Sequence, residues 1–286
     1  MWAKERSVLT VTKPKPDSET IRKYALAAYQ GTQRSYQYLQ DHVIPVLQSM
    51  LSRTEYEESL VGAYYRSHLL MRSLVKLDHP DDFQAVRSLA RSMFELLLDM
   101  KSLQRDPALS KRYSSFPMIE RMRTAIQVAD FVAAHLSTAL NTKYKHQIAL
   151  AGDTNTLQEC EDTLRDVFGI TTNISADRAR RFPKSWSRSD IKTQATRSGL
   201  EDEENYVAEY PVGSWFVHGG FVGMQGITFD GFVNAYGRGH LLAQKSCHGS
   251  TFIIGKELKL FDAQIDLWTN LKELQSLPGK LFNRFM

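Results

Sequence analysis

The amino-acid sequence predicts an all-α protein, a bundle of long antiparallel helices. Apolar residues recur at helical spacing along several long stretches, as Phe83, Val86 and Ala90 do in one of them. No alternating strand pattern persists, and no internal repeat is apparent. Hydrophobic residues make up 42% of the 286 residues and charged residues 24%, as is typical of a folded soluble protein.

The first half of the chain predicts five helices. Ser18 is suited to cap the first one, in which Gly31 and Pro45 are expected to introduce a bend or a split. The next three are predicted over residues 55–77, 81–106 and 117–145, the last with Pro117 near its first turn. A fifth is predicted over residues 153–169, with Asp153 or Thr154 as its cap and Gly169 as its stop.

The second half is less regular. Residues 170–205 predict a basic, loop-rich insertion that includes one brief helix closed by Gly199. A short helix is expected over residues 206–217, and an irregular glycine-rich segment over about residues 219–249. An amphipathic helix over residues 250–277 is expected to follow, with Ser250 or Thr251 as its cap.

The overall organisation predicted is a flexible N-terminal arm, residues 1–16, and a single helical domain, residues 17–286. The arm ends in "KPKP", whose prolines break helices. Cys160 and Cys247 form no metal or disulfide framework, so we expect no structural metal and no cofactor. No apolar run is long enough to cross a bilayer, and the first residues lack the apolar core of a signal peptide. These observations predict a cytoplasmic protein with no membrane association.

One side of the helix predicted over residues 81–106 carries charged groups. Arg87, Arg91 and Glu95 are four residues apart, so they share that side, near the apolar stripe. Ionised groups placed there are costly unless they are paired, so we expect them to find each other or a third partner. The alternative is a surface salt bridge between residues one helical turn apart.

The stretch "YPVGSWFVHGG", residues 210–220, contains a second candidate group. Ser214 and His218 are four residues apart, which on one helical turn would bring a hydroxyl beside an imidazole. The stretch lacks a Gly-x-Ser-x-Gly turn and an identifiable acidic partner, which argues against hydrolase chemistry. The alternative is a core histidine near the end of a helix.

Three segments together carry a resemblance to a family. In the order "RSLARSMFELLLDM", "FPKSWSRSDIKTQATRSGL" and "YVAEYPVGSWFVHGG", the chain resembles the domain of unknown function 5677 family over roughly residues 55–275. The matching positions are Arg91, Glu95, Trp186, Ile191, Tyr206 or Tyr210, Ser214, His218 and Gly219. The resemblance implies a helical fold in which Arg91, Glu95, Ser214 and His218 form one polar cluster.

A looser similarity is to the HEPN helical ribonucleases. Their active site is an arginine followed a few residues later by a histidine, and Arg72 and His79 match that spacing. His79 is expected to lie past the helix end, however, and His218 has no arginine in the corresponding upstream window.

Two functional hypotheses follow. The first is a sensing or interaction module with a buried Arg/Glu/Ser/His site, by analogy part of a bacterial defence or toxin-like system, with a protein partner or a homodimer interface. The second is a metal-independent ribonuclease in which His218 acts as acid or base, Arg91 or Arg87 stabilises the phosphate, and Glu95 orients them. In the second hypothesis, RNA is held by a segment with a marked excess of positive charge, the candidates being Arg178, Arg180, Arg181, Lys184, Trp186, Arg188 and Lys192.

Overall fold

The computed structural model describes residues 17–50, 53–174, 182–187, 189–211 and 228–260. In these ranges the secondary structure is helical, with no strand. The all-α prediction is therefore confirmed. None of the described helices combines the length and the apolar character needed to cross a membrane.

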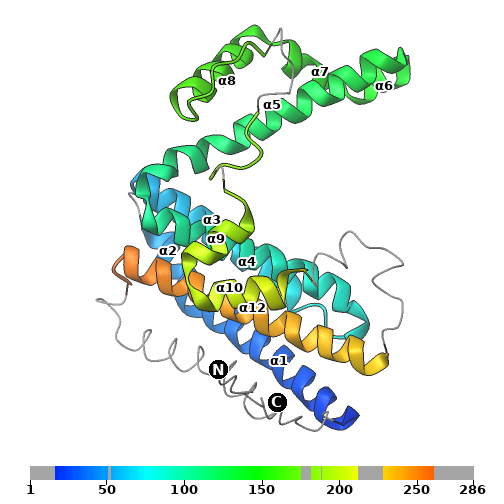
Figure 1. The fold of residues 1–286 in the computed structure, drawn as a ribbon, viewed down its shortest axis with the longest axis vertical. Coiled ribbons are helices and arrows are strands. Elements are labelled where there is room, and N and C mark those ends of the chain that lie inside the picture. The colour runs from blue at the N-terminus through cyan, green and yellow to red at the C-terminus, as the bar shows by residue number, and fades with distance from the viewer. Residues whose placement is uncertain (1–16, 51–52, 175–181, 188, 212–227, 261–286) are drawn as a thin grey trace, which may run out of the picture.

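Four long helices build the main bundle (Figure 1). They are α1 (Ser18–Tyr38), α3 (Glu55–Leu74), α4 (Phe83–Arg105) and α12 (Phe229–Glu257). The helix α4 packs most extensively on α12 and also contacts α3, while α1 covers α12. Their apolar faces meet in one continuous core, in which residues such as Phe94, Met93 and Leu98 of α4 are fully buried.

Helix α1 is continued by two shorter pieces. A π-helical turn, Leu39–Val43, leads into α2 (Ile44–Ser49), with Pro45 in its first turn. The chain therefore stays helical through Pro45, and the π-helical turn before it takes the place of the expected bend or split, because proline lacks the amide hydrogen that a regular α-helical turn needs. Gly31 lies inside α1, where its surface meets the Gln244 carboxamide of α12.

Helix α12 corrects two expectations for the end of the chain. Residues 229–249 were expected to be irregular because of their glycines, but they form one continuous helix with residues 250–257. A β-carbon on Gly237 would lie 2.8 Å from the ring of Tyr24, so this glycine allows close approach of α1 and α12. Ser250 and Thr251 lie inside the helix and donate to carbonyls one turn earlier instead of capping it. Residues 219–227 and 261–277 lie outside the described residues.

A buried polar seam joins α1 to α12. Ser35 Oγ lies 2.9 Å from His248 Nε2, and Thr32 Oγ1 lies 3.1 Å from His240 Nδ1. Gln244 donates to the Ala28 carbonyl at 2.7 Å. Burial lowers the pKa of His240 to about 3 and that of His248 to about 4, so both imidazoles are neutral near pH 7.

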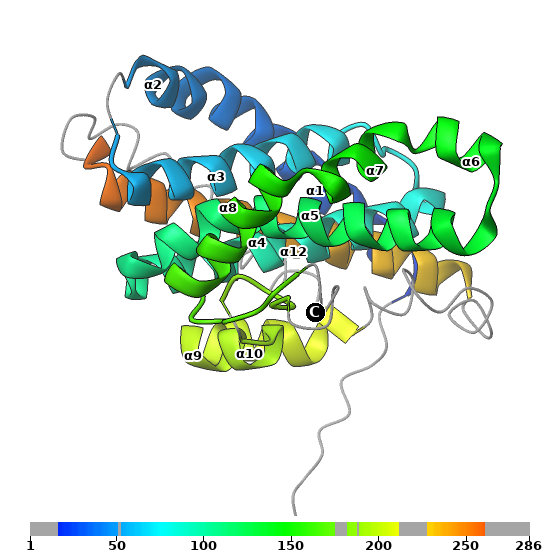
Figure 2. The ribbon, with the colours of Figure 1, turned by 90° about the horizontal axis from the view of Figure 1, so that it is seen from above.

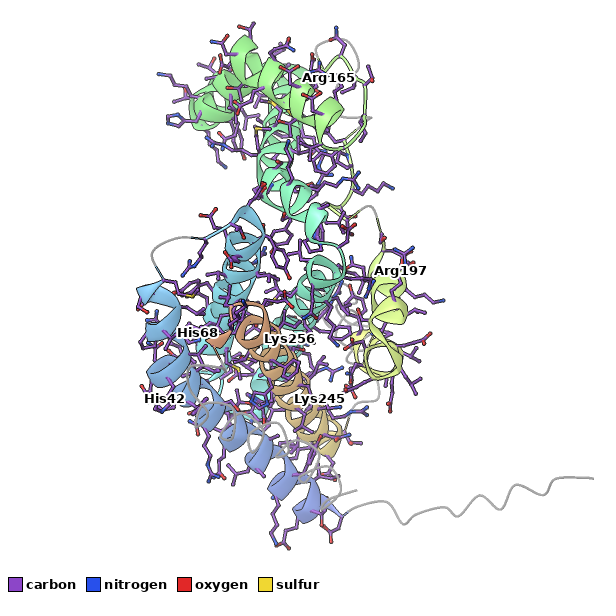
Figure 3. All side chains as sticks on the ribbon, turned by 90° about the vertical axis from the view of Figure 1, so that its left-hand side faces the viewer. His42, His68, Arg165, Arg197, Lys245 and Lys256 are labelled. Carbon is purple, nitrogen blue, oxygen red and sulfur yellow. The ribbon has the colours of Figure 1, made fainter. Side chains whose placement is uncertain are left out.

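The helix α5 (Ser110–His135) leads from the main bundle to a second packed region. This region contains α6 (Thr138–Lys143), α7 (Lys145–Gly152) and α8 (Thr154–Asp166), seen above the bundle in Figure 1. It has its own small core, formed by the second half of α5 together with residues such as Cys160, Leu164 and Phe168. In Figure 3, Arg165 lies in this region, and Arg197 lies beside the main bundle. The division into an arm and a single domain stays a prediction, and residues 1–16 lie outside the described residues.

The predicted start of the fourth helix is wrong. Helix α5 begins at Ser110, and Pro117 lies within it. Pro107 occupies the early position in the preceding 3-10 turn, while Pro117 leaves the helix one internal hydrogen bond short. The helix also ends earlier than expected, at His135, because Leu136 adopts a left-handed conformation with φ 45°.

Several predicted helix ends are confirmed. The side chain of Asp153 accepts the Thr156 amide hydrogen and caps α8, and Gly169 follows with φ 64°. The helix α9 (Ile191–Ser198) stops at Gly199, whose φ is 118°. A second helix that was not predicted, α10 (Leu200–Ala208), follows within the stretch expected to be loop-rich. Residues 210–211 are helical again after a turn at Glu209, and residues 212–217 of the helix expected over residues 206–217 lie outside the described residues. Figure 2 shows α9 and α10 on the side of the bundle opposite α2.

Candidate functional site

A row of polar residues lies along one side of α4 and contacts residues 182–187 and 209–210. Arg87, Arg91, Glu95 and Asp99 are spaced one turn apart and lie on one side of this helix. Three of them hydrogen-bond to residues 209–210 and the fourth to Trp186. The row therefore links distant parts of the chain to α4 through hydrogen bonds.

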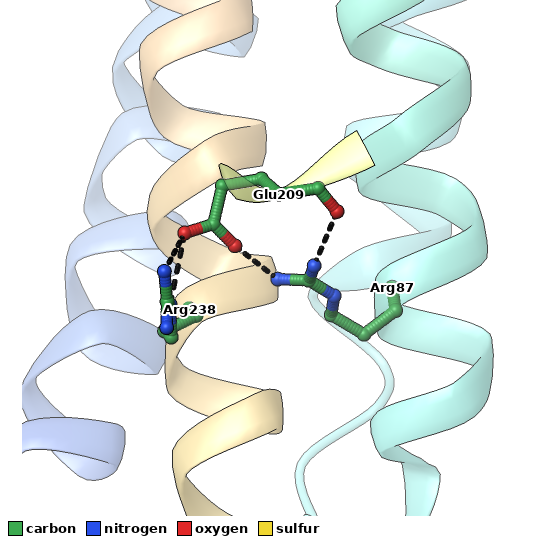
Figure 4. A network of polar contacts seen from close by, with 3 residues as sticks. All are labelled: Arg87, Glu209 and Arg238. Atoms are coloured by element: carbon green, nitrogen blue, oxygen red, sulfur yellow. Dashed lines mark hydrogen bonds and ion pairs between the residues drawn. The ribbon is translucent and has the colours of Figure 1, made fainter. Parts of the chain in front are cut away.

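Arg87, the first member of the row, belongs to a network of three charged residues with Glu209 and Arg238 (Figure 4). Arg87 donates to Glu209 Oε2 at 2.6 Å and to the Glu209 carbonyl oxygen at 2.6 Å. The other carboxylate oxygen, Oε1, accepts from Arg238 Nε of α12 at 2.8 Å. One carboxylate thus joins α4 to α12 at the end of α10.

Burial makes the charge of Arg87 dependent on its partner Glu209. The Arg87 side chain is 1% exposed and that of Glu209 is 14% exposed. Burial lowers the pKa of Arg87, while the charge of Glu209 opposes this shift. An arginine has a pKa so far above neutrality that it stays charged, so Glu209 is its necessary counterion.

One turn further along, Arg91 and Glu95 share Tyr210. Arg91 Nε donates to Glu95 Oε1 at 3.1 Å, and Arg91 Nη2 donates to the Tyr210 hydroxyl at 2.8 Å. That hydroxyl donates in turn to Glu95 Oε1 at 2.7 Å. The Arg91 guanidinium also lies 4.4 Å from the centre of the Tyr210 ring, within range of a cation–π contact.

The last member of the row, Asp99, lies against Trp186. The indole Nε1 donates to Asp99 Oδ1 at 3.0 Å, and the edge of the Trp186 ring meets Tyr113 of α5. Burial raises the pKa of Asp99 to about 7, and the charge of Glu95 adds to this rise, whereas the Trp186 hydrogen bond and, more weakly, the charge of Arg66 lower it. A carboxyl group tuned to titrate near neutrality is typical of functional sites, although structural networks also produce such shifts.

A cleft of about 820 Å³ opens beside Asp99. It lies between α4, the first half of α5 and residues 182–194. Its walls combine apolar and aromatic side chains with a similar number of polar and charged ones. The lining residues are Glu95, Asp99, Phe116, Ile170, Phe182, Pro183, Lys184, Ser185, Trp186, Ser189, Asp190, Ile191 and Gln194. This volume is in the range of small-ligand sites.

The structure places some of the predicted site residues together. Arg91 and Glu95 are hydrogen-bonded partners, and Arg87 lies one turn away in a separate network. Ser214 and His218 lie outside the described residues, as do Gly219 and four of the predicted RNA-binding residues, Arg178, Arg180, Arg181 and Arg188.

The described RNA-binding candidates are dispersed. Lys184 is exposed at the cleft, and Lys192 lies on α9. Trp186 is only 6% exposed, so its ring is mostly covered by protein. Asp202, in the acidic stretch of residues 201–204 that follows, is buried and paired with Lys101 of α4.

The pair matched to the HEPN ribonucleases lies elsewhere. Arg72 is exposed in the last turn of α3, and His79 is exposed beyond the helix end, where its ring accepts the Asp81 amide hydrogen. In the described ranges no group of three histidine, cysteine or acidic side chains is placed to hold a metal ion.

Sequence reasoning missed Glu209, Arg238 and Asp99. Asp99 could have been found, because it continues the four-residue spacing of Arg91 and Glu95. Nothing in the sequence separates Glu209 from its acidic neighbours on α10, since its role depends on a contact across more than a hundred residues.

A comparison with protein families gives one match for this sequence. The sequence profile of the family of unknown function DUF5677 matches residues 57–231. The chain belongs to this family. The match covers the whole α4 row and its partners Trp186, Glu209 and Tyr210, whereas Arg238 lies beyond it. No curated protein and no solved structure gave a significant match.

Proposed function

We propose that this DUF5677 protein is a non-catalytic sensing module that binds a small ligand in the cleft beside Asp99 and Trp186. The observation that carries the proposal is the cleft of about 820 Å³, with an acidic group and aromatic rings in its wall. Such a combination of apolar walls and a few placed polar groups is what ligand sites commonly present.

The rest of the polar row acts as a structural brace beside this site. Arg87 and Arg91 are already committed to Glu209, Glu95 and Tyr210, which hold the end of α10 on α4. Trp186 fixes residues 182–187 in the same way through Asp99. The brace therefore holds the chain segments before α9 and after α10 against α4.

The same contacts argue against the ribonuclease hypothesis. A guanidinium that stabilises a phosphate must reach it, yet the Arg87 side chain is 1% exposed and that of Arg91 is 19% exposed. Each would have to leave its carboxylate before it could bind RNA. A link to bacterial defence or to toxin-like systems, a protein partner and a homodimer all stay predictions.

Binding in the cleft can be tested with a neutral aromatic probe. The Trp186 indole N–H gives its own signal in a ¹H–¹⁵N correlation spectrum, assigned by its loss in Trp186→Phe. Benzyl alcohol is expected to shift this signal in a saturable way. The shift should vanish in Ser185→Phe, which fills the cleft, and persist in Ser73→Phe, which places the same ring on the exposed face of α3.

Two results would overturn the proposal. One is a Trp186 signal that benzyl alcohol does not move, or moves equally in Ser185→Phe. The other is RNA cleavage in EDTA that Arg91→Ala abolishes without changing the thermal melt, since this would identify a catalytic role for the row.

A further inference from the structure

We infer that the cleft is selective for a small organic cation, an ammonium group carried on an aromatic or aliphatic body. This inference rests on the proposed function and names the ligand class of the same site. It follows from the sign and placement of the charges around the cleft, the free acceptor on Asp99, and the aromatic walls.

The charged groups of the lining are mainly acidic. Glu95, Asp99 and Asp190 contribute carboxylates, and Lys184 contributes the one ammonium group among the described lining residues. Lys184 is exposed, so its charge is well screened by solvent, whereas Asp99 lies beside the indole of Trp186. Among the described lining residues, an anion entering the cleft would meet these carboxylates with little compensation.

Two of the three carboxylates already have partners. Glu95 accepts from Arg91 and Tyr210, and Asp190 caps α9 by accepting the Thr193 amide hydrogen. Asp99 accepts from Trp186 through Oδ1 only, and within the described ranges no group donates to its Oδ2. The structure thus leaves one carboxylate oxygen of the cleft wall available to a ligand donor.

The groups around Asp99 do not supply that donor. Glu95 precedes it on α4 and is acidic, and Tyr113 of α5 meets the indole of Trp186 edge-on. Arg66 of α3 exerts a weak electrostatic influence on Asp99 but forms no ion pair with it. An ammonium group bound at Oδ2 would therefore provide the counterion that this carboxylate lacks.

The aromatic walls suit the same ligand class. Phe116, Phe182 and Trp186 line the cleft, and aromatic faces attract cations through their quadrupole. An apolar stem or ring on the ligand would bury its surface against these side chains and Ile191. A carboxylate in the wall of a cleft with aromatic side chains thus recognises both the charge and the body of an organic amine.

Three probes with one ring and different charges test the inference. Benzylamine is cationic near neutral pH, benzyl alcohol is neutral and phenylacetate is anionic. Titrations followed at the Trp186 indole signal at about pH 8, where Asp99 is mostly ionised, should show benzylamine binding about tenfold more tightly than benzyl alcohol, a difference of about 1.4 kcal/mol. Phenylacetate should bind most weakly.

The variant Asp99→Asn removes the charge while keeping an oxygen for the Trp186 hydrogen bond. It should bind benzylamine no more tightly than benzyl alcohol, with the affinity for benzyl alcohol unchanged. The matched control Asp162→Asn, on α8 and outside the cleft lining, should keep the tenfold preference. If Asp99→Asn does not fold, the order of the three probes on the wild-type protein decides the question.

The outcomes separate the two proposals. If benzyl alcohol binds in the cleft and benzylamine binds no more tightly, or if phenylacetate binds best, the inferred ligand class is overturned and the binding function stands. The same holds if Asp99→Asn retains the preference for benzylamine. If none of the three probes moves the Trp186 signal, the binding function and the ligand class both fall.

Discussion

The buried carboxylate of Glu209 offers the sharpest test of the brace. In Glu209→Gln, Arg87 and Arg238 lose their shared counterion while the side chain keeps nearly the same shape. Arg87 is 1% exposed, so its positive charge would stay in a poorly solvated place without compensation. Breaking a buried ion pair by removing one partner typically costs about 3–5 kcal/mol.

The structure narrows this estimate. The glutamine can still accept one hydrogen bond, and Glu209 itself is 14% exposed, so we expect a loss near the lower limit, about 3 kcal/mol. Removing Arg238 should cost less, about 1 kcal/mol in Arg238→Met, because its side chain is 37% exposed and solvent screens its charge. Glu209→Gln should therefore be clearly the more destabilising change.

Urea unfolding followed by far-ultraviolet circular dichroism measures both losses. The matched control is Glu204→Gln, the same substitution at an exposed position of α10, expected to change stability by no more than about 0.5 kcal/mol. In a double-mutant cycle, adding Arg87→Met to Glu209→Gln should restore part of the lost stability, because the uncompensated charge is gone. A Glu209→Gln protein as stable as Glu204→Gln would refute the assignment of Glu209 as the counterion of a buried arginine.

Three further predictions follow from burial and packing. The pKa values of His240 and His248 are lowered in the folded protein, so the unfolded chain binds protons more readily. As the pH falls from about 7.5 to about 5, the free energy of unfolding should therefore drop by about 2 kcal/mol for each histidine. Urea midpoints that do not change over this pH range would contradict this prediction. The raised pKa of Asp99 acts in the opposite direction, because the folded protein holds this proton more tightly and loses stability as the pH rises from about 4 to about 7. Asp99→Asn should therefore stabilise the protein more at about pH 8 than at about pH 4. Equal shifts of the urea midpoint at the two pH values would disprove this prediction. Gly237→Ala should lower the free energy of unfolding by about 1–3 kcal/mol, since the new β-carbon would crowd Tyr24 and the α1 backbone. Gly62→Ala on α3, with open space around it, should raise the free energy of unfolding by up to about 1 kcal/mol. Thermal melts with the reverse order would exclude close packing at Gly237.

Local patterns in the sequence predicted much of the fold. Helices such as α4, and helix ends such as those at Gly169 and Gly199, depend on residues that are close together in the sequence. Their local pattern was therefore enough to predict them. The glycines of α12 misled the prediction. A glycine weakens an isolated helix, but Gly237 is kept in one by the close packing it allows against α1.

The candidate site divides in the same way. The spacing of Arg91 and Glu95 predicts their hydrogen bond, because that contact lies within one helical turn. The partners Glu209, Arg238 and Trp186 come from elements far away in the sequence, and only the packing of α10, α12 and residues 182–187 on α4 brings them to the row. A counterion for Arg87 was expected from the cost of burying a charge, but that cost alone does not say which carboxylate provides it.

The polar row combines two physical roles along one helix, and these roles can be separated by experiment. Glu209→Gln should lower the free energy of unfolding by about 3 kcal/mol and leave benzylamine affinity within about twofold at temperatures where the protein is folded, because Glu209 does not line the cleft. Asp99→Asn should do the reverse, weakening benzylamine about tenfold at about pH 8 without destabilising the fold. Both quantities come from the same samples by urea titration and by the Trp186 signal. If Glu209→Gln weakened benzylamine as strongly as Asp99→Asn does while the protein remained folded, brace and cleft would be one coupled unit, and the separation of the two roles along α4 would be wrong.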